Sequence, residues 1–94
     1  MTVSELLGEG RSNARTRQEL ADLLQCNPRE VTKRIEYERQ QGAAICASVS
    51  APLGYYLAGS REELSAYCGS LDRRLRSITT TRDAIRQTAD EWKV

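Results

Sequence analysis

Histidine and phenylalanine are absent from this chain of 94 residues, and tryptophan occurs once. Without histidine, no imidazole is available to activate a serine, cysteine or lysine nucleophile or to ligate zinc. The adjacent carboxylates Glu62 and Glu63 sit at an expected helix start, where they serve as capping groups rather than as an acid–base pair in a cleft. We therefore expect no enzymatic activity, no metal site and no cofactor, and nothing implies a small-molecule ligand.

Long hydrophobic runs are also missing. No apolar stretch approaches the eighteen or so residues that a membrane-spanning helix needs. The N-terminal sequence Met-Thr-Val-Ser-Glu lacks the charged-then-apolar pattern of a secretory signal. We expect a cytoplasmic protein with no membrane partner.

Cysteine is scarce, and its spacing is uninformative for metal binding. Cys26, Cys46 and Cys68 are odd in number and lie far apart, so neither a zinc knuckle nor a disulfide framework is indicated. We expect each to be a small, partly buried apolar residue.

Excess charge of one sign is absent as well. The net charge is +1, and residues 1–42 carry equal numbers of basic and acidic groups. Bulk charge thus gives no attraction to phosphate, so any nucleic-acid binding depends on where the charges lie. The apolar fraction of 39% is enough for one domain, whose core must use Leu, Ile, Val, Ala and Tyr.

What the chain does contain is a pair of well-marked helices over residues 16–42. Thr16 and Glu19 form a capping box, and Asn27 and Pro28 mark a second start. Gly42 supplies a stop. We expect helices from about Arg17 to Leu24 and from about Pro28 to Gln41, joined by a short turn. Such a helix-turn-helix presents its second helix at a width that the DNA major groove accepts.

Apolar spacing predicts the buried faces of these helices. The first should bury the stripe Leu20, Ala21, Leu23 and Leu24, and the second Val31 and Ile35. A shorter helix is expected before them, with a capping box at Thr2–Glu5 and an end at Gly8.

After Gly42 the pattern changes to that of a β-hairpin. Residues 43–49 and 55–58 read as strands around a turn at 50–54. Alternation places Tyr55 and Leu57 on one face and Tyr56 on the other. Because a lone hairpin is unstable, it must pack on the helices. We expect packing roles, half-buried, for Tyr37 and Tyr56.

The C-terminal part reads as one long helix that begins with a capping box at Ser60–Glu63. Its length is about 30 residues, on the order of 45 Å. Gly69 and residues 77–81 leave open whether the helix is continuous or kinked. Large apolar residues recur mostly at seven-residue spacing and favour pairing with a second copy over folding back on the same chain: Leu64, Leu71, Leu75, Ile78, Ile85 and Trp92.

Several short motifs occur in the order typical of one family. They are Glu19-Leu20-Ala21, the alternating Cys26–Ile35 segment, Gly42, Ile45 and Gly54-Tyr55-Tyr56-Leu57. Over about 40 residues the chain resembles the small winged helix-turn-helix domain of biotin-operon repressors and related bacterial and phage regulators. The expected fold is mainly α (α+β): three helices plus a β-hairpin wing over residues 1–58, then a C-terminal helix over 59–94.

The resemblance implies contacts with DNA at matching positions. The helix that begins at Pro28 would lie in the major groove, with base or phosphate contacts from Asn27, Pro28, Arg29, Thr32 and Lys33. Arg15, Thr16 and Arg17 match the position that clamps the DNA backbone, where exposed helix amides favour phosphate.

The sequence also departs from the family pattern. The segment 43–60 has no charged residue, so only Ser48 and Ser50 could donate hydrogen bonds from the wing. Glu38 stands where the family usually has an apolar residue, so the end of that helix should be exposed or differently packed.

These observations favour a homodimeric, sequence-specific double-stranded DNA-binding protein, a small transcription regulator of bacterial or phage type. Its half-sites would lie about one helical turn apart. The alternative is a protein-interaction adaptor in a phage or bacterial assembly. One contiguous positive face combining Arg15, Arg17, Arg29 and Lys33 would favour DNA, whereas alternating signs would favour the adaptor.

Overall fold

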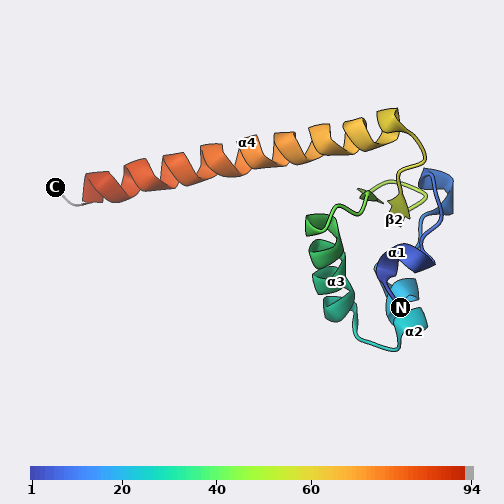
Figure 1. Ribbon diagram of the computed structural model, residues 1–94. Coiled ribbons are helices and arrows are strands. Elements are labelled where there is room, and N and C mark those ends of the chain that lie inside the picture. The colour runs from blue at the N-terminus through green and yellow to red at the C-terminus, as the bar shows by residue number, and fades with distance from the viewer. Residues whose placement is uncertain (93–94) are drawn as a thin grey trace.

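Three helices near the N-terminus enclose one apolar core in the computed structural model, which describes residues 1–92 (Figure 1). They are α1 (Val3–Leu6), α2 (Arg17–Leu24) and α3 (Pro28–Gln40), with a short 3₁₀ turn at Arg11–Asn13. A hairpin of β1 (Ile45–Ser48) and β2 (Gly54–Leu57) and a long helix α4 (Arg61–Trp92) follow. The expected mainly helical α+β class is therefore confirmed. The innermost side chains are Val3, Leu20, Val31, Ile45 and Cys46.

Capping side chains set the helix boundaries as predicted. Thr16 Oγ1 accepts a hydrogen bond from the Glu19 amide at 3.1 Å, and the Glu19 carboxylate accepts one from the Thr16 amide at 3.0 Å. Asn27 Oδ1 accepts from the Glu30 amide at 2.8 Å. After α3, Gly42 has φ of +101°, the left-handed conformation that ends a helix.

Three predictions of burial are wrong. Leu23 is 49% exposed because α2 buries the side that carries Leu20 and Ala21, and Leu23 lies at the margin of that side, far from Ala21. Tyr37 is 65% exposed, on the outer face of α3. Cys68 is exposed on α4, whereas Cys46 is buried and Cys26 partly so.

The hairpin is antiparallel, with Ile45 opposite Leu57 and Cys46 opposite Tyr56. The free edge of β2 is occupied by the segment before α2. Arg15 and Tyr55 exchange two backbone hydrogen bonds of 2.9 and 2.7 Å, and the Gly10 amide donates to the Leu57 carbonyl at 2.8 Å. At Gly54, with φ of +126°, an added Cβ would lie 2.1 Å from the Arg15 carbonyl oxygen, so only glycine fits.

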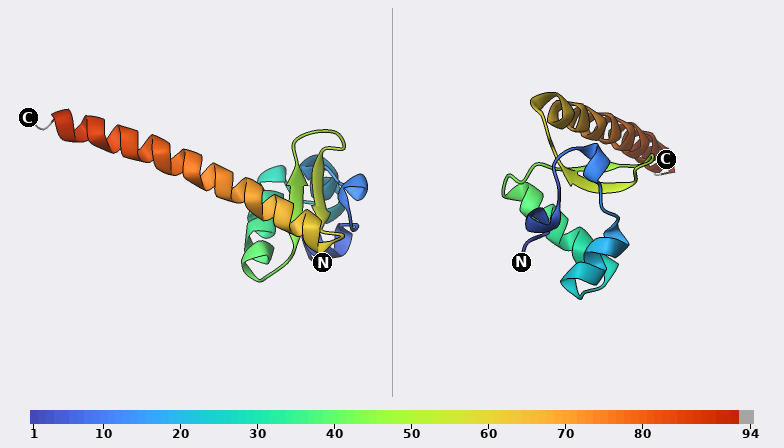
Figure 2. Two further views of the ribbon diagram at one scale, coloured as in Figure 1. Left: turned by 90° about the horizontal axis from the view of Figure 1, so that it is seen from above. Right: turned by 90° about the vertical axis from the view of Figure 1, so that its right-hand side faces the viewer.

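The two faces of the hairpin are both covered. Tyr55 and Leu57 pack against the helical core, as the alternation predicts. On the other face, Tyr56 and Cys46 are buried beneath α4, and burial raises the pKa of both groups. Tyr56 thus packs as expected, more deeply than half-buried. Figure 2 shows the resulting order of layers: helices, hairpin, then α4.

Helix α4 runs without interruption from Arg61 to Trp92, which settles the question of a kink. Ser60 Oγ accepts from the Glu63 amide at its start. Beyond the hairpin the helix projects as an arm (Figure 1). The molecule accordingly measures 54 × 31 × 26 Å, and its radius of gyration of 16.8 Å exceeds the roughly 12 Å typical of a compact domain this size. Positions 93 and 94 of the expected C-terminal segment lie outside the described residues.

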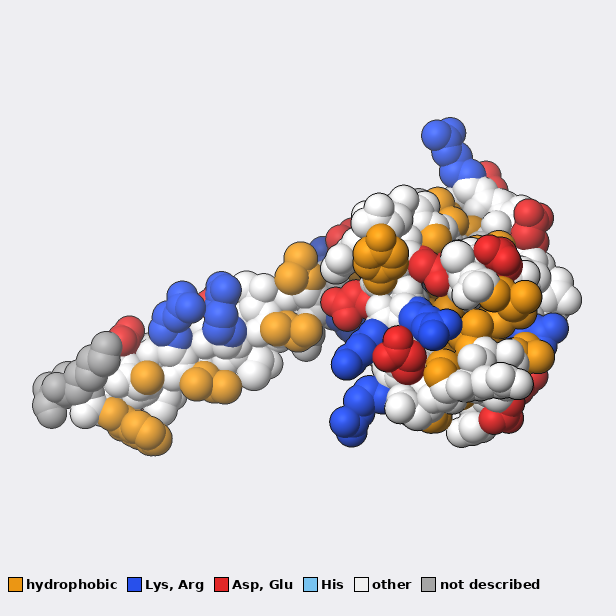
Figure 3. All heavy atoms as spheres, turned by 60° about the horizontal axis from the view of Figure 1, so that its bottom comes forward, with side chains coloured by type: hydrophobic (Ala, Val, Ile, Leu, Met, Phe, Trp, Pro, Cys, Tyr) orange, Lys and Arg blue, Asp and Glu red, His pale blue; other side chains and the backbone are white. Residues whose placement is uncertain are grey.

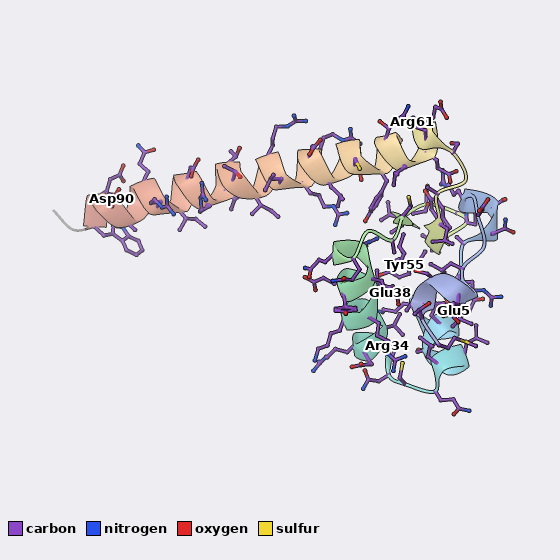
Figure 4. The ribbon with its side chains drawn as sticks, in the orientation of Figure 1. Glu5, Arg34, Glu38, Tyr55, Arg61 and Asp90 are labelled. Atoms are coloured by element: carbon purple, nitrogen blue, oxygen red, sulfur yellow. The ribbon has the colours of Figure 1, made fainter. Side chains whose placement is uncertain are left out.

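The Glu38 side chain connects α3 to α1. Its carboxylate accepts hydrogen bonds from the Val3 amide at 2.7 Å, the Ser4 amide at 2.9 Å and the Ser4 hydroxyl at 2.6 Å. Figure 4 labels Glu38 on the side of α3 that faces α1. A carboxylate in this position satisfies amide groups at the helix start that otherwise have no acceptor.

We expect Glu38→Gln to lower the free energy of unfolding by about 1–2 kcal/mol at pH 7, the usual cost of a lost helix cap. Burial opposes ionisation of Glu38, but the hydrogen bonds from Ser4 and Val3 outweigh it and lower its pKa below 4.5. A lowered native pKa stabilises the fold above pH 4.5, and this contribution is lost as pH falls through the native pKa. Urea unfolding at pH 7 and pH 3 should show the difference only at pH 7. Glu36→Gln, on the exposed face of α3, is the control; an equal loss there would contradict the capping role.

Candidate nucleic-acid interface

The outer face of α3 carries most of the predicted base contacts. Arg29, Thr32 and Lys33 are all exposed, and their spacing places them along one side of the helix. The Thr32 hydroxyl donates to the Pro28 carbonyl at 3.3 Å, a long bond that leaves its oxygen open to a ligand. Glu36 and Tyr37 continue the same exposed side. This face can donate hydrogen bonds from two cationic groups, and it also presents one carboxylate.

At the start of α3, Asn27 and Pro28 were both predicted to contact DNA, and both have a structural role in beginning the helix. The Asn27 side-chain oxygen caps the helix, while its amide nitrogen makes no hydrogen bond within residues 1–92. Pro28 is the first helical residue and has no N–H to donate. The Asn27 amide nitrogen is therefore the side-chain donor at this point that is free to bind a ligand.

The start of α2 brings together Arg15, Thr16 and Arg17. Arg15 is held through its backbone to Tyr55, and the Arg17 side chain is exposed. The capping box already uses the Thr16 and Glu19 amides, so Arg17 and Gln18 supply the remaining free helix amides. The hydrogen bond from the Thr16 backbone lowers the pKa of Glu19, which keeps a negative charge beside this position. A phosphate here would meet both the amides and that carboxylate.

Arg11 brings a positive charge to the hairpin turn, a contact that the sequence did not indicate. Arg11 Nη2 donates to the Ser50 carbonyl at 3.3 Å, to the Ala51 carbonyl at 3.2 Å and to the Ser50 hydroxyl. The Ser48 hydroxyl donates to the Ser50 carbonyl at 2.7 Å, so its proton is already used. The Ser50 hydroxyl remains free to donate. No local signal links Arg11 to a turn almost forty residues later, so the sequence could not reveal this contact.

Charges of both signs are interleaved over this end of the molecule (Figure 3). The charge of Arg15 acts on the Glu19 carboxylate, and Glu36 follows Lys33 by three residues on the same side of α3. Glu30 pairs with Arg34 at 3.5 Å, an exposed contact of little energetic weight. The basic side chains therefore do not form one contiguous positive face.

No family model matches this chain, and no curated protein or solved structure does so either. Support for any function thus comes from the residues themselves. Among residues 1–92, no helix is both long and apolar enough to span a bilayer, and no three potential ligand side chains are grouped to hold a metal ion.

The apolar row on α4 has little covering from its own chain. Leu75, Ile78 and Ile85 are 64–65% exposed, and Trp92 is 82% exposed. Leu64 and Leu71, nearer the hairpin, are 37% and 40% exposed. Figure 3 shows apolar side chains spaced along the arm. An extended row of this kind is unusual on a surface that stays in water.

Proposed function

We propose that this chain is a winged helix-turn-helix protein that binds specific double-stranded DNA as a homodimer, a small transcription regulator of bacterial or phage type. The observation that carries the proposal is the pairing of Arg15 with Tyr55. It places a third strand-like segment, between α1 and α2, against a hairpin that follows α3. The resemblance implies three helices followed by a hairpin, and this edge segment, which it did not include, ties the start of α2 to that hairpin.

In this proposal α3 enters the major groove, with Arg29, Thr32 and Lys33 facing the base edges and phosphates. The Arg17 and Gln18 amides and the Arg17 side chain contact the DNA backbone at the start of α2. Arg11 supplies the hairpin with the cationic group that segment 43–60 lacks. Glu19 and Glu36 weaken non-specific attraction to phosphate, so binding should depend strongly on contacts with the right bases.

The two arms would pair through the apolar row of α4. Five of its members recur every seven residues, which is the spacing of a coiled-coil seam. Two-fold pairing presents two copies of α3 and therefore predicts a palindromic site.

Selection of duplexes from a random pool at low salt tests the proposal. We expect one palindromic motif, and we expect Arg29→Ala with Lys33→Ala to weaken binding to it by at least about 30-fold, since each base contact contributes on the order of 1–3 kcal/mol. Fluorescence anisotropy measures the affinities. The control, Arg76→Ala with Arg86→Ala, removes equal charge from α4 and should bind like wild type. Equal affinity of wild type and the α3 variant for every sequence would contradict the recognition role.

The interleaved charges support a second candidate, a protein-interaction adaptor. A face that carries Lys33 beside Glu36 suits a partner protein with charges of both signs better than a uniformly negative polymer. The same selection experiment separates the two candidates. Absence of any enriched duplex, together with no binding at low salt, would favour the adaptor.

A further inference from the structure

A cleft of about 690 Å³ opens where α4 crosses the end of α3 and the hairpin. Its basic residues come from two separate helices: Arg39 from α3, and Arg73 and Arg74 from α4. Neither aspartate nor glutamate lines it. The cleft lies apart from the outer face of α3, on the side of the domain that meets the arm.

The Arg39 side chain is held in place at this cleft by contacts with the backbone and with two tyrosine rings. Its Nε donates to the Ile45 carbonyl at 2.9 Å, while Nη2 is buried without an acceptor. The guanidinium lies 5.1 Å from the centre of the Tyr67 ring and 5.9 Å from that of Tyr55. Aromatic rings attract a cation but do not neutralise it. Within residues 1–92, Arg39 has no carboxylate partner.

The two α4 arginines add to this uncompensated charge. Arg73 and Arg74 are exposed at the cleft and form no ion pair with any described residue. Three guanidinium groups around one hollow repel one another unless an anion lies between them. Arginine is also the side chain best suited to bind a phosphate or carboxylate through two parallel hydrogen bonds.

Most of the remaining lining favours an apolar body, with Ser70 and Ser77 as its polar members. Tyr55, Tyr67, Ala47 and Val49 line the cleft alongside the arginines. Its volume lies in the range of about 300–1,000 Å³ that is usual for small-molecule sites. Tyrosine rings offer flat surfaces on which a planar group can stack.

We infer that this cleft binds a small organic anion in which a phosphate or carboxylate is attached to a planar apolar body. The charged group would contact Arg73 and Arg74, and the planar part would lie against the tyrosine rings beside Arg39. Such a ligand would bridge α4 and the hairpin and so stabilise the direction of the arm. The site does not depend on DNA binding by α3.

The probe for this site is 1-naphthyl phosphate, titrated into full-length protein and followed by the NMR signals of the arginine Nε–H groups. We expect saturable shifts that include Arg39. Inorganic phosphate and 1-naphthol should each bind at least about tenfold more weakly, because the first lacks the planar ring and the second lacks the charged group. The variant Arg73→Gln with Arg74→Gln should lose at least about tenfold in affinity. Its control, Arg76→Gln with Arg86→Gln, removes equal charge elsewhere on α4 and should bind like wild type.

Three results would overturn the inference. One is unchanged affinity in the Arg73→Gln, Arg74→Gln variant, and another is 1-naphthol binding as tightly as its phosphate. The third is no binding of 1-naphthyl phosphate while this variant loses affinity for duplex DNA, which would assign these arginines to backbone phosphates. The test of α3 uses Arg29 and Lys33, so failure here leaves that test unaffected.

Discussion

Replacing Leu20 by alanine is expected to lower the free energy of unfolding by about 3 kcal/mol. Leu20 is fully buried at the centre of the helical core, where it belongs to the same cluster as Val3, Val31 and Ile35. Leucine-to-alanine changes in such positions cost about 2–5 kcal/mol, because buried methyl groups are lost and a cavity remains. Urea unfolding followed by circular dichroism measures the change.

Leu23 provides the matched control, since it is the same residue type on the same helix. It is 49% exposed, so Leu23→Ala should change stability by less than about 1 kcal/mol. The pair isolates burial from helix propensity. Equal losses for the two variants would mean that α2 presents a different face to the core.

The second large effect concerns the arm. We expect Ile78→Lys with Ile85→Lys to convert a dimer into a monomer, with a dissociation constant raised at least about 100-fold. Both isoleucines are 65% exposed in the single chain and would be buried by pairing. Burying two lysines without partners costs several kcal/mol, and each 1.4 kcal/mol is a factor of ten. Sedimentation equilibrium of the full-length protein measures this.

Thr80→Lys with Gln87→Lys is the control for that experiment. These positions are also exposed and seven residues apart, but they lie on the opposite side of α4. The control should remain a dimer, and a chain ending near Ser60 should be a monomer. Wild-type protein that sediments as a monomer would refute pairing through the arm.

The helix boundaries were predictable because their signals are local. Thr16, Glu19 and Asn27 act on amides within three residues of themselves, and the sequence alone shows that spacing. The same holds for the alternation along β2, which correctly divided Tyr55 from Tyr56. Leu23 was misassigned although the sequence already places it at the margin of the side that carries Leu20 and Ala21, next to Leu20 but far from Ala21.

Contacts between distant residues could not be predicted. Glu38 was recognised as an unusual residue, but the amides of Val3 and Ser4 that donate to its carboxylate lie more than thirty positions away. The contacts of Arg11 with the hairpin turn and of Arg39 with two tyrosine rings also join residues that are distant in the sequence. Each of these contacts depends on how the helices and strands pack. The identity of a polar residue in the sequence does not indicate which distant residue it will contact.

The uninterrupted arm has a consequence for how the chain responds to dilution. From Leu71 to Trp92 every residue except Thr79 is exposed, so only backbone hydrogen bonds and neighbouring side chains hold this stretch in a helix. A solitary helix of such length is only marginally stable in water. Association of two arms would therefore be partly a folding reaction. Separated chains would fray from the C-terminal end, while the core around Leu20 stayed intact.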